Sequence, residues 1–598
     1  MLPDATNAAV WFLLFWHVAA MTANLAASDS PAPGGDPRNI RQGLPIPDRG
    51  YCDQPYIVVT PDGHWVCTMT TGSGREGERG QHVVATISTD QGRSWSELIE
   101  IEPPDGPEAS WIVPLITPAG RIYGFYTYNG DDVRTLDGKP IRADVIGWYV
   151  FRYSDDGGRT WSAERHRLPL RVTACDRGND FQGRVQIFWG IDKPSVIGSD
   201  VVFAFTKLGK YMLEQGEGWM FRSDNLLTER DPRKLRWELL PAGDRGIRND
   251  AFGSVQEEHN VVPLNDRDLY CVYRTTLGYP AHAYSRDGGR SWTRPELMSY
   301  APGGRRIKTP RACPMVWRTE DGKLLFWFHN NSEKSYQSRN PVWISGGTVH
   351  DGHVHWSQPE ILLYDPDPQQ RISYPDLIQQ DGQFWISETQ KTIARVHAVD
   401  RQLLEGLWAQ GKSKTVSSDG LLLDLDAEQL GQAGHPLPRP LDLAQNSGLA
   451  IDVWFQLDDL APGQVLLETG DDEGRGWTLS ITAAGSLQIA LNDGTSSVRW
   501  ASDAGLIRAG SLHHAVVIAD SGPRIISLMV DGQLCDGGET RDYGWTRFPE
   551  GLGDVSGSGL LRAGKMLRGS LRRVRLYDRY LRTSEAVAHY HAGPERME

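Results

Sequence analysis

The chain has 598 residues and a formal net charge of −14, with 39% hydrophobic and 23% charged residues. This composition is typical of globular proteins, and the length predicts two or three domains because it exceeds what one hydrophobic core supports. An acidic chain lacks the basic surface that binding to phosphates requires, so the charge argues against nucleic acid and anionic membranes as partners.

Residues 1–27 contain an apolar run, AAVWFLLFWHVAA, followed by small residues, which is typical of a signal peptide. The residues before the run, MLPDATN, lack the usual Lys or Arg. His17 interrupts the run, so we expect cleavage rather than a membrane span in the mature chain. Residues 28–42 form a linker rich in Pro, Gly and Ser. The sequence therefore predicts an exported protein that is secreted, periplasmic or bound to the cell surface.

An internal repeat dominates the first two-thirds of the chain. The pattern Ser-x-Asp-x-Gly-x-x-Trp occurs at 88–95, 154–161 and 285–292, with a degenerate copy at 350–357. Its Asp can accept hydrogen bonds from a turn backbone, its Gly supplies a positive φ angle, and its Trp can pack under the turn. The pattern resembles the Asp-box, or BNR repeat, of sialidases and related β-propellers. That resemblance places these residues on outer hairpins, where they are structural.

Six short segments have the pattern of an innermost propeller strand, in which an apolar run comes just before a turn. They are 51–60, 108–117, 188–197, 254–264, 309–318 and 372–380. We therefore expect an all-β fold with a six-bladed propeller over 43–400, and seven blades remain an alternative.

The pattern of apolar and polar residues changes near residue 400. We expect a connector over 401–417 and a two-sheet β-sandwich over 418–592, because apolar and polar residues alternate there without helical periodicity. The segments AIDVWFQL (450–457) and GSLRRVRLYDRYLRTSEAVAHY (569–590) resemble laminin-G and concanavalin A-like jelly-roll domains. Such a domain either binds sugar or packs beside an enzyme, and the sequence leaves both open.

Six cysteines occur without a CxxC pair or zinc spacing. They either form a single bridge in the propeller or are small buried residues. No cofactor motif and no metal cluster is evident, although a structural calcium ion in the sandwich stays open.

Polar groups are concentrated where the six inner strands begin, close to the propeller axis. A purely structural strand would begin with Val, Ile or Ala, so this pattern predicts a functional cleft. The groups are Asp53, Gln54, Glu108, Trp111, Trp189, Asp192, Lys193, Glu257, Glu258, His259, Arg311 and Tyr374.

The resemblance to sialidases implies roles for some of these residues. In that family a Tyr nucleophile is activated by a Glu, and a carboxylic acid on a mobile loop serves as acid and base. Tyr374 matches the nucleophile, with its phenol oxygen facing solvent, and Glu258 matches its partner, with Glu257 as the competing choice. Glu76 or Glu78, in the loop GSGREGERG, matches the acid/base position.

The family also uses three Arg to bind the substrate carboxylate, and this chain retains two candidates, Arg274 and Arg311. The first Arg of an Arg-Ile-Pro motif is replaced by Asp53-Gln54-Pro55. Arg75, Arg371 and Lys193 are candidates to compensate.

Further substrate contacts are expected among the residues where the inner strands begin, here called the strand heads. Others are expected in two polar segments, 328–343 and 387–397. The residues expected to contact substrate from the strand heads are Asp53, Gln54, Trp111, Asp192, Lys193 and His259. From the polar segments they are His329, Asn330, Arg339, Asn340, Glu388 and Lys391.

These features predict an exported carbohydrate-active protein with a glycan or polysaccharide as its partner. The leading form is a sialidase-like exo-glycosidase with altered specificity. Two alternatives stay open. One is a uronate-directed hydrolase or lyase that uses His259 as a base, and the other is a glycan-binding propeller without catalysis.

Overall fold

The structure is a computed structural model that describes residues 35–210, 214–564 and 566–595. The predicted signal peptide (1–27) and residues 28–34 of the linker lie outside these residues. From Asp36 onward the described residues belong to one compact unit. No helix within them is long and apolar enough to cross a membrane.

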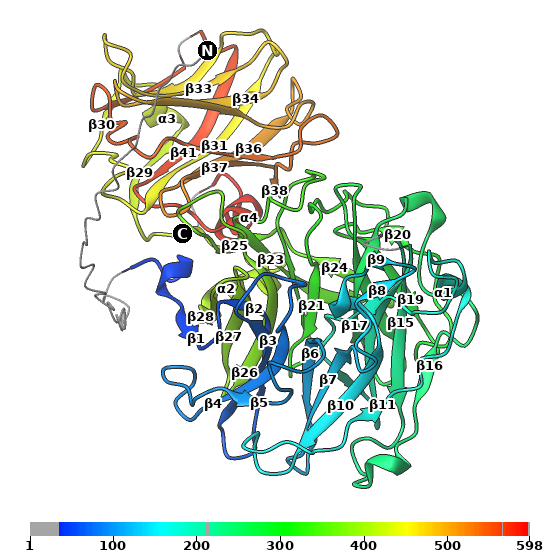
Figure 1. The fold of residues 1–598 in the computed structure, drawn as a ribbon. Helices are drawn as coiled ribbons and strands as arrows, with labels where there is room; N and C mark the ends of the chain where they lie inside the picture. Colours follow the sequence, from blue (N-terminus) through cyan, green and yellow to red (C-terminus); the bar gives the residue numbers. More distant parts are fainter. Residues whose placement is uncertain (1–34, 211–213, 565, 596–598) are drawn as a thin grey trace, which may run out of the picture. The chain divides into compact units, whose positions relative to one another are not determined.

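Six antiparallel sheets form the blades of a propeller, and the innermost strand of each lies in a predicted segment (Figure 1). The six-bladed all-β fold is therefore confirmed. Blade one contains β2 (Tyr51–Val59), β3 (Trp65–Gly72), β4 (His82–Ser88) and β5 (Ile99–Glu100). Blade two contains β6 (Ala109–Ile116), β7 (Ile122–Tyr128), β10 (Trp148–Ser154) and β11 (His166–Arg167). Blade three contains β12 (Phe188–Trp189), β13 (Ser195–Ile197), β14 (Asp200–Lys210), β15 (Glu214–Ser223) and β16 (Glu238–Leu240).

The remaining blades follow the same order. Blade four contains β17 (Gln256–Pro263), β18 (Leu269–Thr275), β19 (Ala281–Ser285) and β20 (Glu296–Leu297). Blade five contains β21 (Met315–Arg318), β22 (Leu324–Phe328), β23 (Val342–His350), β24 (His353–Trp356) and β25 (Glu360–Leu363). Blade six contains β26 (Ser373–Gln380), β27 (Gln383–Thr389), β28 (Ala394–Val399) and, as its outer strand, β1 (Leu44–Ile46). The first strand of the chain thus completes the last blade.

Short elements decorate the propeller. They are the hairpin β8 (Thr135–Leu136) and β9 (Lys139–Pro140), the helix α1 (Ala174–Arg177), and the 3-10 turns η1 (Ile40–Gln42), η2 (Ala143–Val145), η3 (Pro232–Lys234) and η4 (Asp250–Phe252). Helix α2 (Arg401–Ala409) begins directly after blade six, with Asp400 as its N-cap.

The three Asp-boxes join the third and fourth strands of blades one, two and four. In the first, Ser88 Oγ donates to Asp90 Oδ1 (2.9 Å), and Asp90 Oδ1 accepts from the Ser94 amide (2.8 Å). Gly92 has a φ of 83° and its amide donates to Ser88 Oγ at 2.8 Å. The motif therefore closes an outer hairpin, as the sequence predicts.

Residues after α2 form a β-sandwich of two sheets around their own core. One sheet contains β29 (Leu421–Asp426), β31 (Gly448–Leu457), β36 (Leu512–Asp520), β37 (Ile525–Val530), β38 (Gln533–Leu534), β39 (Trp545–Arg547) and β41 (Gly569–Tyr577). The other contains β30 (His435–Pro436), β32 (Val465–Glu468), β33 (Gly476–Ile481), β34 (Leu487–Asn492), β35 (Ser497–Ala501) and β40 (Leu560–Ala563). Helices α3 (Ala427–Leu430) and α4 (Thr583–Ala592) complete it.

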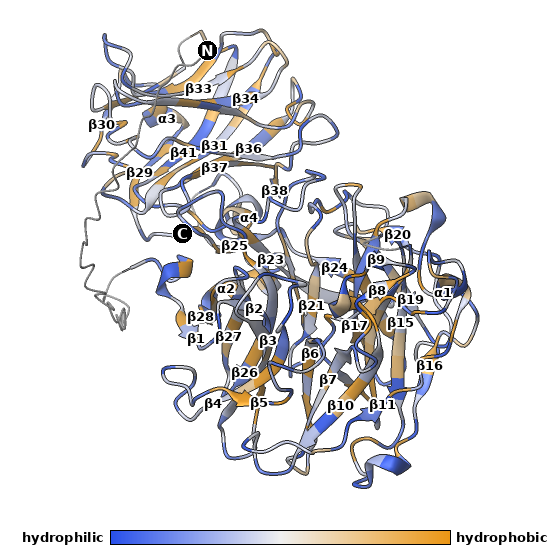
Figure 2. Ribbon diagram, in the orientation of Figure 1, coloured by the Kyte–Doolittle hydropathy of each residue, from blue (hydrophilic) through white to orange (hydrophobic). Residues whose placement is uncertain are grey.

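Hydrophobic residues follow the strands of both parts, and hydrophilic residues are frequent in the connections (Figure 2). The propeller core is rich in aromatic rings that pack between blades, such as Phe125 against Phe203 at 4.8 Å between ring centroids. All six cysteines are free and buried, so they act as small core residues.

Candidate functional site

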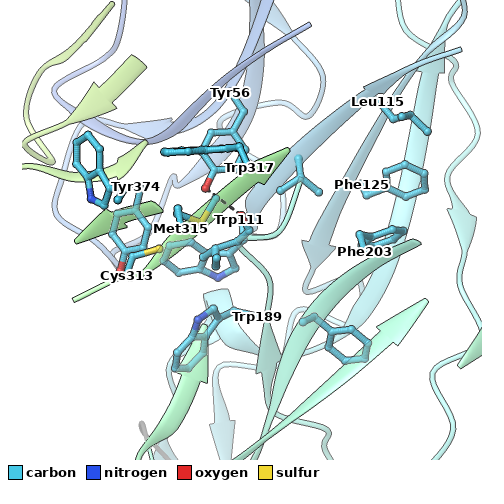
Figure 3. Close-up of a cluster of buried hydrophobic side chains, with 14 of the residues drawn as sticks. Tyr56, Trp111, Leu115, Phe125, Trp189, Phe203, Cys313, Met315, Trp317 and Tyr374 are labelled. Carbon is cyan, nitrogen blue, oxygen red and sulfur yellow. Dashed lines mark hydrogen bonds between the residues drawn. The ribbon is translucent and has the colours of Figure 1, made fainter. Parts of the chain in front are cut away.

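A cavity of about 220 Å³ opens at the propeller axis, where the inner strands begin. It is lined by Glu76, Trp111, Arg142, Val145, Trp189, Ile191, Glu258, Arg274, Arg311, Tyr336, Arg339, Arg371, Tyr374 and Lys391. Figure 3 shows Trp111, Trp189 and Tyr374 gathered on one side with Tyr56 and Cys313. The structure therefore brings ten of the predicted site residues together, and every blade contributes at least one of them. They are Glu76, Trp111, Trp189, Glu258, Arg274, Arg311, Arg339, Arg371, Tyr374 and Lys391.

Backbone bulges orient the side chains at this end of the propeller. Strands β2, β6, β17 and β26 each lose regular register near their first residues. The bulged residues have positive φ angles: Gln54 (52°), Trp111 (61°), Glu258 (57°) and Tyr374 (47°). Such a conformation costs about 1–3 kcal/mol for a non-glycine residue, and a bulge re-aims the side chain. The bulged residues of blades two, four and six are Trp111, Glu258 and Tyr374, and all three line the cavity.

Tyr374 and Glu258 form the centre of the site. The Tyr374 hydroxyl donates to Glu258 Oε1 at 2.8 Å, and Arg274 Nη1 lies 2.7 Å from the same oxygen. Burial and the Glu258 charge raise the pKa of Tyr374 well above its usual value. Tyr374 is only 8% exposed, so the expectation of a solvent-facing phenol is wrong, because the hydroxyl is engaged by Glu258. The pair has the geometry for transfer of the phenol proton to a carboxylate.

Glu257 lies behind this pair and outside the cavity lining. Its Oε2 accepts from Arg274 Nε (2.9 Å) and Nη2 (2.6 Å), and burial raises its pKa. Arg274 is therefore held between two carboxylates, and Glu258 is the one that lines the cavity.

Three arginines form one wall. Arg339 is 5% exposed, and donates to Ser373 Oγ at 2.9 Å and to the Arg311 carbonyl at 2.8 Å. Within the described residues, Arg339 and Arg371 pair with no carboxylate, and Arg311 reaches Glu257 only at 3.6 Å. The atoms Arg311 Nη2 and Arg339 Nε are buried without a hydrogen-bond partner. Unused donors of this kind suit an anionic ligand.

Lys391 lines the cavity beside Tyr374 and has an unusual set of neighbours. Its φ is 73°, and its ammonium contacts Asp53 Oδ2, lies 3.0 Å from Glu76 Oε2, and lies 4.3 Å from the ring centroid of Tyr374. Glu76 also accepts from Arg142 Nη2 at 2.7 Å. Burial favours the neutral acid, but Lys391 and Arg142 outweigh it and hold the pKa of Glu76 well below its usual range. Glu76 is therefore a carboxylate in this arrangement.

Nine predicted contacts do not line the cavity, and His329, Asn330 and Asn340 of the polar segment 328–343 are three of them. The other six have structural partners. Asp53 is fully buried beside Lys391 and accepts from the Tyr51 hydroxyl (2.9 Å), and Gln54 donates to the Gly190 carbonyl (3.0 Å). Lys193 pairs with Asp376 (2.7 Å) and Glu388 with His397 (3.2 Å). Asp192 accepts from the amides of Ala204 (2.6 Å) and Val261 (3.1 Å) and so joins blades three and four.

His259, the sixth, is fully buried behind the cavity wall. It shares a hydrogen bond with Thr206 Oγ1 at 2.9 Å, and Nε2 lies 3.1 Å from the Ile247 carbonyl oxygen. Burial lowers its pKa to about 3, so it is neutral at ordinary pH. Of the three candidates to compensate for the missing Arg, only Arg371 lines the cavity; Arg75 and Lys193 do not.

Sequence reasoning did not single out Arg142 or Tyr336, which come from long connections within blades two and five. No group of three or more His, Cys, Asp or Glu side chains is placed to hold a metal ion in the described part of the chain.

Comparison with known structures returns sialidases at low identity. The chain is similar to Trypanosoma rangeli sialidase, with 14% identity, a TM-score of 0.41, and coverage of 91% of this chain and 94% of that one. The same sialidase in complex with sialic acid matches with 13% identity, a TM-score of 0.40, and coverage of 93% and 96%. A Hadza microbial sialidase matches with 17% identity, a TM-score of 0.42, and coverage of 60% and 68%.

Comparison by sequence gives two family assignments and no curated relative. No curated protein matches the chain. The family of BNR repeat-like domains matches residues 217–386, and the concanavalin A-like lectin/glucanases superfamily (laminin G type) matches residues 431–587. The chain thus combines a BNR repeat-like domain, in a six-bladed propeller, with a concanavalin A-like, laminin G-type sandwich.

Proposed function

We propose that the protein is an exported exo-glycosidase that removes a terminal anionic sugar from a glycan. The observation that carries the proposal is the hydrogen-bonded pair of Tyr374 and Glu258, facing a cavity rich in arginine. A phenol paired with a carboxylate is a competent nucleophile once its proton is taken, and both members of this pair line the cavity. Export is proposed from the apolar segment near the N-terminus.

The charge of the cavity supports an anionic substrate. Six described lining residues are cationic and two are carboxylates. Arg311 and Arg339 retain buried donors without partners, and a guanidinium matches a carboxylate in two parallel hydrogen bonds. A neutral phenol can also approach an anionic sugar without the repulsion that a carboxylate nucleophile would meet.

The size of the cavity supports action at a chain end. Its volume of about 220 Å³ is below the roughly 300–1,000 Å³ of pockets that take drug-sized ligands. One sugar unit fits such a space, whereas a polysaccharide chain needs an open groove.

The proposed reaction has two half-reactions. In the first, the Tyr374 oxygen bonds to the anomeric carbon, the phenol proton passes to Glu258, and the bond to the leaving oxygen breaks. In the second, water attacks the anomeric carbon and the Tyr374 oxygen leaves, taking a proton back from Glu258. Glu76 is the other carboxylate of the cavity lining and is ionised, so we assign it the proton of this water. We infer that the first half-reaction favours leaving groups of low pKa, which depart without a proton.

A screen of aryl glycosides of sialic acids and uronic acids tests the proposal, with release of the aryl alcohol as the signal. Wild-type turnover that is lost in Tyr374→Phe supports it. New ultraviolet absorbance from an unsaturated uronate would instead indicate a lyase, although His259 lies outside the cavity. Binding on a glycan array without turnover of any glycoside would contradict the proposal and favour a glycan-binding protein.

A further inference from the structure

The connection between β22 and β23 supplies two residues of the cavity lining. Tyr336 and Arg339 both come from residues 329–341, which contain no strand of the propeller. Tyr336 is 49% exposed at the cavity mouth, whereas Arg339 is 5% exposed and donates to Ser373, the neighbour of Tyr374. Residues 329–341 do not pair with a propeller strand, so their backbone groups must form hydrogen bonds with other parts of the protein. The partners of 329–341 therefore determine where these two side chains lie.

The start of this connection is bonded to the sandwich. Trp545 Nε1 donates to the Asn330 carbonyl at 3.0 Å, and Asn331 forms an antiparallel bridge with Tyr543. The Ser332 amide donates to the Asp542 carbonyl at 3.0 Å. Ser332 Oγ also donates to Asp542 Oδ1, at 2.8 Å.

The end of the connection is bonded to the same sandwich strand, β39. Arg547 Nη2 donates to the Asn340 carbonyl at 3.1 Å, and Arg547 Nη1 donates to the Pro523 carbonyl at 2.6 Å. Trp545 is 6% exposed, and its ring lies 6.5 Å from that of Trp343, at the start of β23. The sandwich thus holds both ends of the segment that carries Tyr336 and Arg339.

The sandwich segment 536–547 is itself well fixed. Asp503 accepts from the amides of Asp536 and Gly537, both at 2.9 Å, and from Arg541 Nη2 at 2.7 Å. Lys308, from the propeller, donates to the carbonyls of Gly538 (2.6 Å) and Arg541 (2.7 Å). Because these hydrogen bonds fix segment 536–547, this segment can hold residues 329–341 in place and does not move with them.

We propose that the sandwich positions the substrate-binding wall of the cavity, with Trp545 and Asp542 as positioning residues that act through Arg339 and Tyr336. The nucleophile pair does not depend on this support, because Tyr374 and Glu258 lie on inner strands of blades six and four. Loss of the support therefore weakens substrate binding and leaves the chemical step intact. Only the kinetic part of this inference rests on the proposed glycosidase function.

The test uses the full chain with Trp545→Phe, which removes the N–H donor and keeps an aromatic ring, and Asp542→Ala, at an exposed position. With an aryl glycoside, each variant is expected to raise KM about five- to tenfold with kcat within twofold, since one lost hydrogen bond is worth about that factor. Hydrogen exchange of amides in 329–341 is expected to rise in both.

Matched controls separate positioning from general destabilisation. Trp477→Phe removes a buried indole of the sandwich core, and Asp554→Ala removes an exposed carboxylate of the sandwich that, within the described residues, accepts hydrogen bonds from Ser556 alone. Both are expected to leave KM and the exchange of 329–341 unchanged. The inference is overturned if Trp545→Phe and Asp542→Ala leave that exchange unchanged, or if they lower kcat at constant KM. If no glycoside is turned over, the exchange measurement still decides the inference, and the proposed function fails by itself.

Discussion

Tyr374 and Glu258 share a hydrogen bond of 2.8 Å although they belong to blades six and four and both hold left-handed backbone conformations, with φ of 47° and 57°. Two strained residues that meet at one hydrogen bond are stabilised by the surrounding blades, since neither conformation is favourable by itself. Strain of this kind concentrates at functional sites, where it fixes side chains in advance of the ligand.

Replacement of Tyr374, the proposed nucleophile, is the most direct test. Tyr374→Phe is expected to lower kcat about 10⁴-fold or more, because the attacking oxygen is removed. The free energy of unfolding is expected to change by about 1 kcal/mol, the contribution of one hydrogen bond. Tyr56→Phe is the matched control, because its buried hydroxyl donates to the Ile191 carbonyl (2.9 Å) and Tyr56 does not line the cavity. Equal losses of activity in both variants would argue against a special role for Tyr374.

The ionised state of Glu76 predicts an accumulating intermediate. In Glu76→Gln, the second half-reaction loses its base, whereas the first is little affected when the leaving group is an aryl alcohol of low pKa. We expect a burst of aryl alcohol followed by a slow phase, and mass spectrometry of the quenched protein should find the sugar attached to Tyr374. A slow first turnover with no burst would instead make Glu76 the proton donor. Glu78→Gln serves as the control, since Glu78 does not line the cavity.

Arg311→Lys tests the anion site. The change keeps the charge and loses the planar fork, so KM for an anionic glycoside is expected to rise about tenfold with a smaller change in kcat. Arg318→Lys, at the exposed end of β21, should leave KM unchanged. Equal KM values for Arg311→Lys and wild type would place the anionic group of the substrate elsewhere.

Lys391→Met leaves the fully buried Asp53 without its cation and removes one of the two cations beside the exposed Glu76. A loss of about 3–5 kcal/mol in the free energy of unfolding is expected near pH 7, as for other broken buried pairs. Because Lys391 holds the pKa of Glu76 below its unfolded value of 4.5, the stability that Glu76 contributes is present above that pH and is lost on acidification. The difference between wild type and variant in urea denaturation should therefore shrink below about pH 4.5.

The control for that variant is Lys193→Met, which breaks the pair with Asp376 outside the cavity. Both variants should be destabilised, but only Lys391→Met should reduce activity measured on the folded protein. Equal activity of the two would remove Lys391 from the site.

Buried histidines make the fold sensitive to acid. Burial lowers the pKa of His259 to about 3 and that of His282 to about 4, below the unfolded value of 6.5. As the pH falls below 6.5, the unfolded chain binds protons that the folded protein does not, and stability falls by about 1.4 kcal/mol per pH unit for each group. His259→Gln should reduce this slope by about one proton. An unchanged slope in His259→Gln would show that the imidazole is not buried and neutral.

The fold could be predicted because its signals are local. The Asp-box hairpins and the apolar runs of the six inner strands each occur within ten or so residues. Alternation along a strand was less informative. A bulge at Glu258 breaks the alternation, so that Glu257 and Glu258 both reach Arg274 while only Glu258 lines the cavity.

The site was only partly predictable because polar residues at strand heads have two uses. Some face the cavity, and others bond the backbone of the next blade, as Asp192 does with Val261 and Asp376 with Ile57 (2.8 Å). The sequence does not distinguish these uses. The sequence also does not show that Arg142 and Tyr336 reach the cavity from long connections, because no local sequence pattern indicates it.

The pairing of Leu44 with Val396 in blade six has a consequence for the order in which the protein folds. A strand at the start of the chain waits unpaired until nearly the whole propeller has been synthesised, and such distant pairing is slow to form. Since Tyr374 belongs to the same blade, we expect its hydrogen bond to Glu258 in blade four to form late, as the ring closes. An unfinished or truncated chain therefore lacks the site, and activity reports on completion of folding.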